Sequence, residues 1–210
     1  HVNSGEGGLI VSDNPEFIAR ATLLSGSYML FERHPAGPGP EVYADLTVAT
    51  PNMSARMDHL RAAILLPQLA RLEKDCAAWN ERYRVLEAGL AGAPGVTLLP
   101  RPAEEAFVGS SFQFNLTDWP AQAIRSYLES CAARGVELKW FGASAPQGFT
   151  STYAHWRFAD PPALTRTDRV RAGLIDMRLP LTLDLEDCAL IARILRSETE
   201  IHAARPDSAA

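Results

Sequence analysis

The residues with the clearest chemical potential lie near the start of the chain, in the sequence Ser4-Gly5-Glu6-Gly7-Gly8. Glycines are used where backbone must come close to a bound ligand, because glycine has no Cβ atom. The cluster is not a phosphate-binding P-loop, since no Gly-Lys-Ser/Thr follows, and it is not a dinucleotide fingerprint, since it precedes an apolar stretch instead of following a strand. The local pattern leaves two interpretations open: a ligand-contacting loop, or a tight turn into a strand.

Lysine, the residue that supplies a nucleophilic amine, is rare in this chain. Of the 20 basic residues, only Lys74 and Lys139 are lysines. Lys74 lies among charged residues, and Lys139 alternates with apolar neighbours, so both are expected on the surface. A reaction that needs a lysine amine must therefore use one of these two residues or take the amine from outside the chain.

Composition and charge exclude several classes of protein. The 210 residues are 47% hydrophobic and 21% charged, as in ordinary globular domains. A net charge of −5 without a basic block argues against a nucleic-acid partner, and no apolar run is long enough to predict a membrane span. The three cysteines are far apart, which fits a reducing compartment and a cytoplasmic protein. The histidines show no metal-binding spacing, so we expect no metal site.

The apolar pattern predicts a chain that changes character near residue 92. Residues 9–11 form a short apolar strand pattern, and Pro15 favours a helix from about residue 16 to residue 24. Helical spacing then runs from Met53 to Leu90, with a kink or break expected at Pro67. After that, strand and helix patterns alternate: strands at 96–99, 111–116, 136–140 and 178–181, and helices at 120–134, 165–175 and 184–196.

Two segments resemble one known family. Residues 3–13, which contain the glycine cluster, resemble the segment that follows the Schiff-base lysine in the DegT/DnrJ/EryC1/StrS family of aminotransferases, which depend on pyridoxal 5'-phosphate (PLP). Residues 52–64 and 68–72 resemble the family's Asn-Tyr-Arg-Met, Ala-Ala-Ile and Gln-Leu stretch. Counted back from Gly5, the family's lysine would stand immediately before His1. The resemblance therefore implies no catalytic residue within the chain.

The resemblance also implies a fold. We expect an α/β chain that is the C-terminal part of a PLP-dependent transferase of fold type I. Residues 1–50 would end the large PLP-binding domain, residues 51–92 would form a long linking helix, and residues 93–200 would form a small C-terminal α+β domain. Residues 201–210 would be a disordered tail.

Four residues take site roles by the same resemblance, in a homodimer with shared active sites. Asn52 would reach the phosphate of the partner subunit's PLP, with Ser54 as a rival at the family's strict spacing. Arg56 would bind the carboxylate of the amino donor, and His155 would face the substrate. Each residue also has a structural interpretation: Asn52 as a helix cap, Arg56 in a surface or interface ion pair, and His155 packed or on the surface.

The function implied is transfer of an amino group from Glu or Gln to a keto-sugar, which we expect to be nucleotide-linked, or to a keto-cyclitol. Two alternatives remain open. Some family members are PLP-dependent sugar 3-dehydratases that carry histidine in place of the lysine, although Gly5 favours an aminotransferase. The chain could also be a non-catalytic fragment that only dimerises or binds a ligand.

Overall fold

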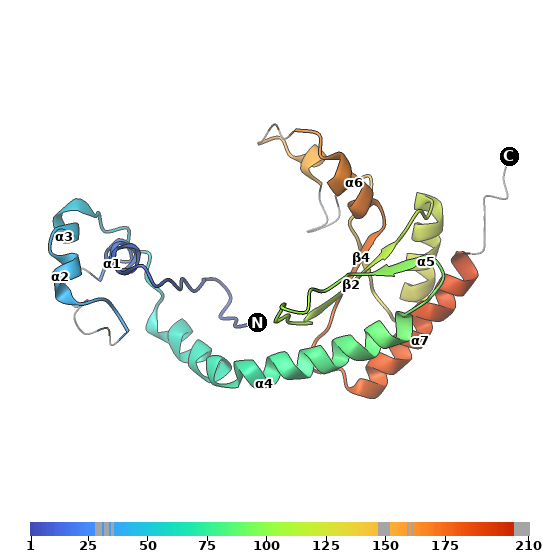
Figure 1. Ribbon diagram of the computed structural model, residues 1–210, viewed down its shortest axis with the longest axis horizontal. Coiled ribbons are helices and arrows are strands. Elements are labelled where there is room, and N and C mark those ends of the chain that lie inside the picture. Colours follow the sequence, from blue (N-terminus) through green and yellow to red (C-terminus); the bar gives the residue numbers. More distant parts are fainter. Residues whose placement is uncertain are drawn as a thin grey trace. The chain divides into compact units, whose positions relative to one another are not determined.

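The computed structural model describes residues 1–27, 31, 34, 36–146, 152–158, 160 and 162–203. The chain divides into two compact units, residues 1–72 and residues 73–210. Helix α4 (His59–Leu90) begins in the first unit and ends in the second (Figure 1). None of the helices in the described ranges combines the length and apolar character needed to cross a membrane. The domain limits predicted from the resemblance stay a prediction, and most of the predicted tail lies outside the described residues.

The first unit begins with an irregular segment that leads into helix α1 (Pro15–Leu24). The side chain of Asn14 caps this helix by accepting a hydrogen bond of 3.0 Å from the backbone N–H of Phe17. Pro15 occupies the first helical turn, where its missing N–H would have no partner anyway. The predicted helix is therefore confirmed, and Asn14 is its cap.

Two short helices complete the small core of this unit, α2 (Pro40–Tyr43) and α3 (Leu46–Ala49). Their buried residues Tyr43 and Leu46 pack with Ala19 and Leu23 of α1. This cluster is small, so the unit has little apolar burial to hold its irregular segments in place.

The strand predicted at residues 9–11 is not formed in the structure. Leu9, Ile10 and Val11 lie outside any helix or strand, and their exposed fractions run from 62% to 92%. A strand needs a neighbouring strand for its backbone hydrogen bonds, and the described residues of this unit contain no strand. The prediction from local pattern was wrong because pairing is a tertiary property.

The long helix begins later than predicted, and it is not split at Pro67. It begins at His59 and not near Met53, because Asp58 accepts a 2.8 Å hydrogen bond from the N–H of Arg61 and caps the first turn. It continues through Pro67 as one helix. Pro67 has no N–H for the carbonyl oxygen of Ala63 one turn earlier, and the next residue, Gln68, donates a side-chain hydrogen bond of 3.0 Å to the carbonyl oxygen of Ile64.

The second unit is built on a four-stranded antiparallel sheet with the strand order β1-β2-β4-β3. The strands are β1 (Val96–Leu98), β2 (Ser111–Leu116), β3 (Lys139–Trp140) and β4 (Leu174–Arg178). In β2, side chains alternate between partly buried and fully buried, and Phe112, Phe114 and Leu116 form the core face. The period of two that predicted this strand therefore reflects a sheet with one apolar face.

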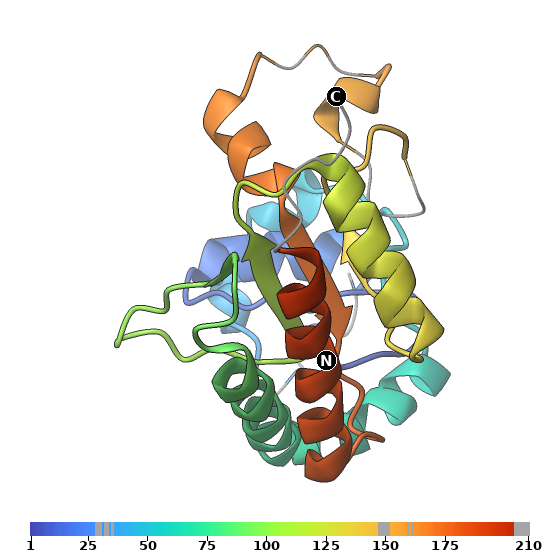
Figure 2. The same ribbon diagram turned by 90° about the vertical axis from the view of Figure 1, so that its right-hand side faces the viewer.

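Helices cover that apolar face (Figure 2). Helix α5 (Ala121–Ala133) and helix α7 (Leu185–His202) lie against the sheet together with the last turns of α4. Tyr83 and Leu86 of α4, Tyr127 of α5 and Leu195 of α7 are at most 1% exposed in the resulting core. The small α+β arrangement thus holds one continuous core between a sheet and three helical segments.

The boundary between α6 (Thr165–Ala172) and β4 falls earlier than the sequence pattern suggested, at Gly173. The carbonyl of Gly173 accepts a 2.9 Å hydrogen bond from the N–H of Leu116 in β2. A Cβ atom at this position would collide with the carbonyl oxygen of Leu116. Glycine is therefore needed where the chain leaves the helix and joins the sheet, and the strand begins at Leu174 in place of 178.

The three cysteines are free thiols, and two of them are buried in the second unit. Burial raises the pKa of Cys131 to about 12. Because the nucleophilic form of cysteine is the thiolate, Cys131 is an inert packing residue at physiological pH.

We expect the second unit's core to dominate its stability. Leu195 is 0% exposed and Leu190 is 48% exposed, and both lie in α7. Leu195→Ala should lower the free energy of unfolding by about 2–5 kcal/mol, because it leaves a cavity in the core. Leu190→Ala should change it by about 0.5 kcal/mol. Urea denaturation of the whole protein followed by circular dichroism tests this, and equal losses for the two variants would contradict the core assignment.

Candidate functional site

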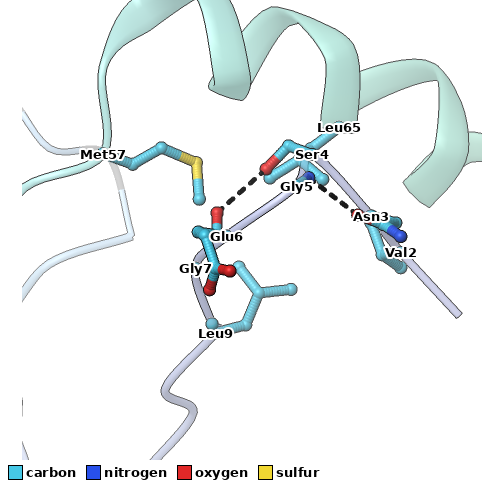
Figure 3. Close-up of a pocket in the computed structure, with 10 residues that line it drawn as sticks. Val2, Asn3, Ser4, Gly5, Glu6, Gly7, Leu9, Met57 and Leu65 are labelled. Carbon is cyan, nitrogen blue, oxygen red and sulfur yellow. Dashed lines mark hydrogen bonds between the residues drawn. The ribbon is translucent and has the colours of Figure 1, made fainter.

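The glycine cluster is an irregular loop whose shape depends on glycine at two positions. Gly5 has φ +95° and Gly7 has φ +131°, backbone conformations that other residues rarely adopt. A Cβ atom at Gly7 would lie 2.9 Å from Cε of Met57. The loop is also closed internally: the N–H of Gly5 donates to Oδ1 of Asn3 at 2.7 Å, and Ser4 Oγ donates to the carbonyl of Glu6 at 3.3 Å (Figure 3).

The loop encloses a hollow of about 170 Å³ against two side chains from another part of the first unit. Its lining consists of residues 2–9 together with Met57 and Leu65, and Figure 3 shows Met57 directed toward the loop. The sulfur-containing side chain and the leucine make one wall apolar, while the loop supplies polar backbone groups. The hollow is therefore amphipathic.

A second hollow, of about 330 Å³, lies beside the first and shares Glu6, Gly7, Gly8 and Met57 with it. Its other residues are Ala55, Arg56, Asp58 and Arg61. The two segments whose sequences resembled one family, some fifty residues apart in the chain, thus meet at one place. The sequence motifs alone did not require this meeting.

The second hollow has two arginines, of which one is paired with a carboxylate and the other has no partner among the described residues. The Arg61 guanidinium forms an ion pair with Asp58. The backbone N–H of Arg61, with its guanidinium, holds the pKa of the Asp58 carboxyl below its usual range, so Asp58 stays ionised. Arg56 makes no ion pair or hydrogen bond with any described residue, although Glu6 and Asp58 line the same hollow. Its guanidinium is available for an anionic ligand.

Asn52 and Ser54 line neither hollow; they form a turn of their own. Asn52 Oδ1 accepts a hydrogen bond of 2.8 Å from the N–H of Ser54, which has φ +51°. A Cβ atom at Gly26 would lie 2.9 Å from the same oxygen, so this amide packs closely on the turn after α1. Within the described residues, Nδ2 of Asn52 has no hydrogen-bond acceptor. Asn52 is not the cap of α4, since Asp58 holds that position.

His155 belongs to the second unit, at the end of a short 3₁₀ helix (Tyr153–His155). Its Nδ1 accepts a hydrogen bond of 3.2 Å from the N–H of Thr152, which leaves Nε2 as the protonated nitrogen. Nε2 donates to the carbonyl oxygen of Ser144 at 3.0 Å. Both ring nitrogens are therefore used by the backbone, and the substrate role of His155 stays a prediction.

The two lysines differ in their surroundings. Lys74 is exposed on α4, whereas Lys139 is partly buried in β3 and pairs in register with Asp176 of β4. No group of three or more His, Cys, Asp or Glu side chains in the described ranges could hold a metal ion.

No site role was predicted for Met57 and Leu65, which line the first hollow, or for Gln68, which holds the loop. Gln68 accepts from the N–H of Asn3 and donates to its carbonyl oxygen, each at 2.8 Å, and so ties the loop to α4. The signal that could have found Gln68 is its place at the start of residues 68–72, one of the segments that carry the family resemblance.

The arrangement suits an anionic ligand. Backbone N–H groups of a glycine loop and a free guanidinium are groups that bind phosphate or carboxylate. Both belong to the first unit and lie within one continuous lining. The residues present therefore fit a ligand that carries such a group, and PLP is one.

Comparison with known proteins agrees with the geometry. The model of the DegT/DnrJ/EryC1/StrS aminotransferase family matches residues 1–196. No curated protein sequence matches the chain closely enough to count as a relative.

Three solved structures illustrate the likeness of fold. The aminotransferase TlmJ from Streptoalloteichus hindustanus superposes with a TM-score of 0.64 at 18% identity, over 91% of this chain and 47% of that one. A putative sugar aminotransferase, Spr1654 from Streptococcus pneumoniae in its PMP form, superposes with a TM-score of 0.59 at 14% identity. The match covers 74% of this chain and 38% of that one. A 3-amino-5-hydroxybenzoic acid synthase superposes with a TM-score of 0.56 at 18% identity. That match covers 72% of this chain and 41% of the synthase.

This chain thus spans less than half the length of each of these neighbours. At such identities they show the fold alone, the C-terminal part of a fold type I transferase. The family match rests on nearly the whole chain and includes both segments that meet at the hollows. This chain belongs to the DegT/DnrJ/EryC1/StrS aminotransferase family.

Proposed function

We propose that the protein is a cytoplasmic PLP-dependent aminotransferase that moves an amino group from Glu or Gln to a keto-sugar or keto-cyclitol. One observation carries the proposal: Arg56, without a partner among the described residues, lines the same hollow as the glycine loop Glu6–Gly8. Family membership supports the reaction class. The Spr1654 neighbour, a putative sugar aminotransferase, supports the sugar substrate, and the benzoic acid synthase supports testing other cyclic keto compounds as well.

The cofactor would supply the electron sink for proton removal at the carbon that bears the amino group. The family uses PLP, and Spr1654 has been solved in a PLP form. In this chain, residues 2–9 and Met57 would form the wall beside the lysine that we place immediately before His1. The apolar side chains of Met57 and Leu65 would keep water from that wall, which strengthens charge interactions inside the site.

Arg56 would orient the amino donor. A guanidinium offers two parallel N–H groups to a carboxylate, so it fixes direction as well as supplying charge. Because Asp58 already neutralises Arg61, Arg56 keeps its charge for the ligand. The donor and its keto-acid product each carry this carboxylate, which is why one residue can hold both.

The dimer role of Asn52 rests on its amide. Oδ1 is occupied by the Ser54 N–H, while Nδ2 remains a donor for an oxygen outside the described residues. A phosphate of the partner subunit's cofactor would provide such an oxygen. Ser54, held in the same turn, is the alternative donor.

The first test concerns the residue before His1 in the full-length protein. Borohydride reduction of the protein with bound PLP should fix the cofactor to a lysine at that position, and peptide mass mapping should find the adduct there. A histidine at that position would favour the sugar 3-dehydratase. Adduct formation only at Lys74 or Lys139 would contradict the proposal.

The second test concerns Arg56. Arg56→Ala should slow the reaction with Glu or Gln roughly ten- to hundred-fold, since a hydrogen bond to a charged group contributes about 1.5–3 kcal/mol. Arg56→Lys should recover part of the rate, because an ammonium cannot form the planar pair of bonds. Single-turnover absorbance of the bound cofactor measures each half-reaction separately. An equal loss in the keto-substrate half-reaction, with weaker dimerisation, would instead assign Arg56 to an interface.

The third test distinguishes the role of the Asn52 acceptor, Oδ1, from that of its donor, Nδ2. Asn52→Asp keeps an acceptor for the Ser54 N–H but removes the donor and adds a charge that repels phosphate, so affinity for PLP should fall. Co-expression with a chain that lacks the catalytic lysine should produce hybrid dimers with one intact site and measurable activity. Hybrids no more active than the parent dimers would show that Asn52 does not act across the interface, and Ser54→Ala would be examined next.

A further inference from the structure

The loop at residues 2–8 is held to α4 by a pair of hydrogen bonds from one side chain. Gln68 Oε1 accepts from the N–H of Asn3 and Gln68 Nε2 donates to the carbonyl oxygen of the same residue, each at 2.8 Å. This exchange of both backbone groups with one partner repeats the pattern of a hydrogen-bonded pair in an antiparallel sheet. The paired bonds fix the direction of the backbone as well as its position.

The Gln68 amide is itself fixed by the helix that carries it. Nε2 also donates to the carbonyl oxygen of Ile64 at 3.0 Å, one turn earlier in the same helix. Three hydrogen bonds on one amide leave it little rotational freedom. The Gln68 side chain therefore has a defined orientation relative to α4.

The loop has few other restraints. Within the described residues, no further hydrogen bond joins residues 2–8 to another part of the first unit, and none of them lies in a helix or strand. Asn3 in turn restrains Gly5, because Oδ1 of Asn3 accepts a hydrogen bond from the N–H of Gly5. The Gln68 contact thus restrains Asn3 directly and the glycine loop through Asn3.

We propose that Gln68 is a positioning residue for the catalytic lysine. The inference rests on the proposed function, in which that lysine stands immediately before His1, three residues from Asn3. Three residues span at most about 11 Å, so a movement of the Asn3 backbone also moves the backbone of the lysine. Misplacement of a reacting group by about 1 Å can lower a rate about a hundred-fold.

The test uses Gln68→Met in the full-length protein, because methionine keeps an unbranched side chain of similar length without the amide. Gln68→Glu is the second variant: it loses the donor and turns a carboxylate toward two carbonyl oxygens. Gln122→Met is the control, since Gln122 is an exposed helical glutamine whose side chain bonds only to Arg125 in the described residues.

The first readout needs no cofactor. Hydrogen exchange at the Asn3 amide of the cofactor-free protein should be at least about ten-fold faster in both Gln68 variants and unchanged in Gln122→Met, since that N–H loses its acceptor or the geometry that holds it. The second readout is the pH midpoint of the absorbance band of bound PLP, which reports the lysine's surroundings. It should shift in both Gln68 variants, with kcat reduced about ten-fold or more and KM for the donor little changed.

Three results would overturn the inference. Unchanged exchange at Asn3 would mean that the contact does not hold the loop. Faster exchange with an unchanged pH midpoint and kcat would make Gln68 a structural residue only. Absence of a PLP–lysine adduct before His1 in the unmodified protein would remove the proposed function and with it this role, a failure seen without any Gln68 variant.

Discussion

Two hydrogen bonds from the Gln68 amide hold the backbone of Asn3 against α4, and the geometry of the candidate site depends on them. A loop with left-handed glycines and no secondary structure cannot fix its own position, because its backbone groups find no regular partners. The small core of the first unit lies elsewhere, around Tyr43. The contact with Gln68 therefore supplies hydrogen-bond partners to both backbone groups of Asn3, as a neighbouring strand does for a residue in a sheet.

The ion pair between Asp58 and Arg61 determines which cation of the site can bind a ligand. Asp58 serves both as the cap of α4 and as the partner of Arg61, so one carboxylate starts the helix and neutralises a guanidinium. Arg56, two residues before Asp58, lies outside the helix and keeps its charge. Because the helix begins at His59, a residue that sequence spacing would have put on a helical surface lies instead in an irregular segment that lines a hollow.

The surplus of arginine over lysine has a structural use in the second unit. Arg82 donates to the carbonyls of Leu183, Ala78 and Leu181, and Arg196 donates to the carbonyl of Gly89. A guanidinium has five N–H groups in a plane, so one side chain can satisfy several backbone oxygens at the ends of helices and in loops. Lysine, with a single ammonium, could not bridge these points in the same way. These two arginines therefore support packing, whereas Arg56 has no partner among the described residues.

The sequence by itself determined the elements whose signals are local. The alternation in Ser111–Leu116 and the helix that begins at Pro15 appear in the structure as predicted, because side-chain period and helix-start signals need only neighbouring residues. Only the tertiary structure decided what depends on distant partners. Leu9–Val11 forms no strand, since strands require pairing, and α4 runs through Pro67 without being split. The meeting of the two motif segments at one hollow, and with it the place of Arg56 in the lining, likewise depends on contacts between residues some fifty positions apart, which no local pattern contains.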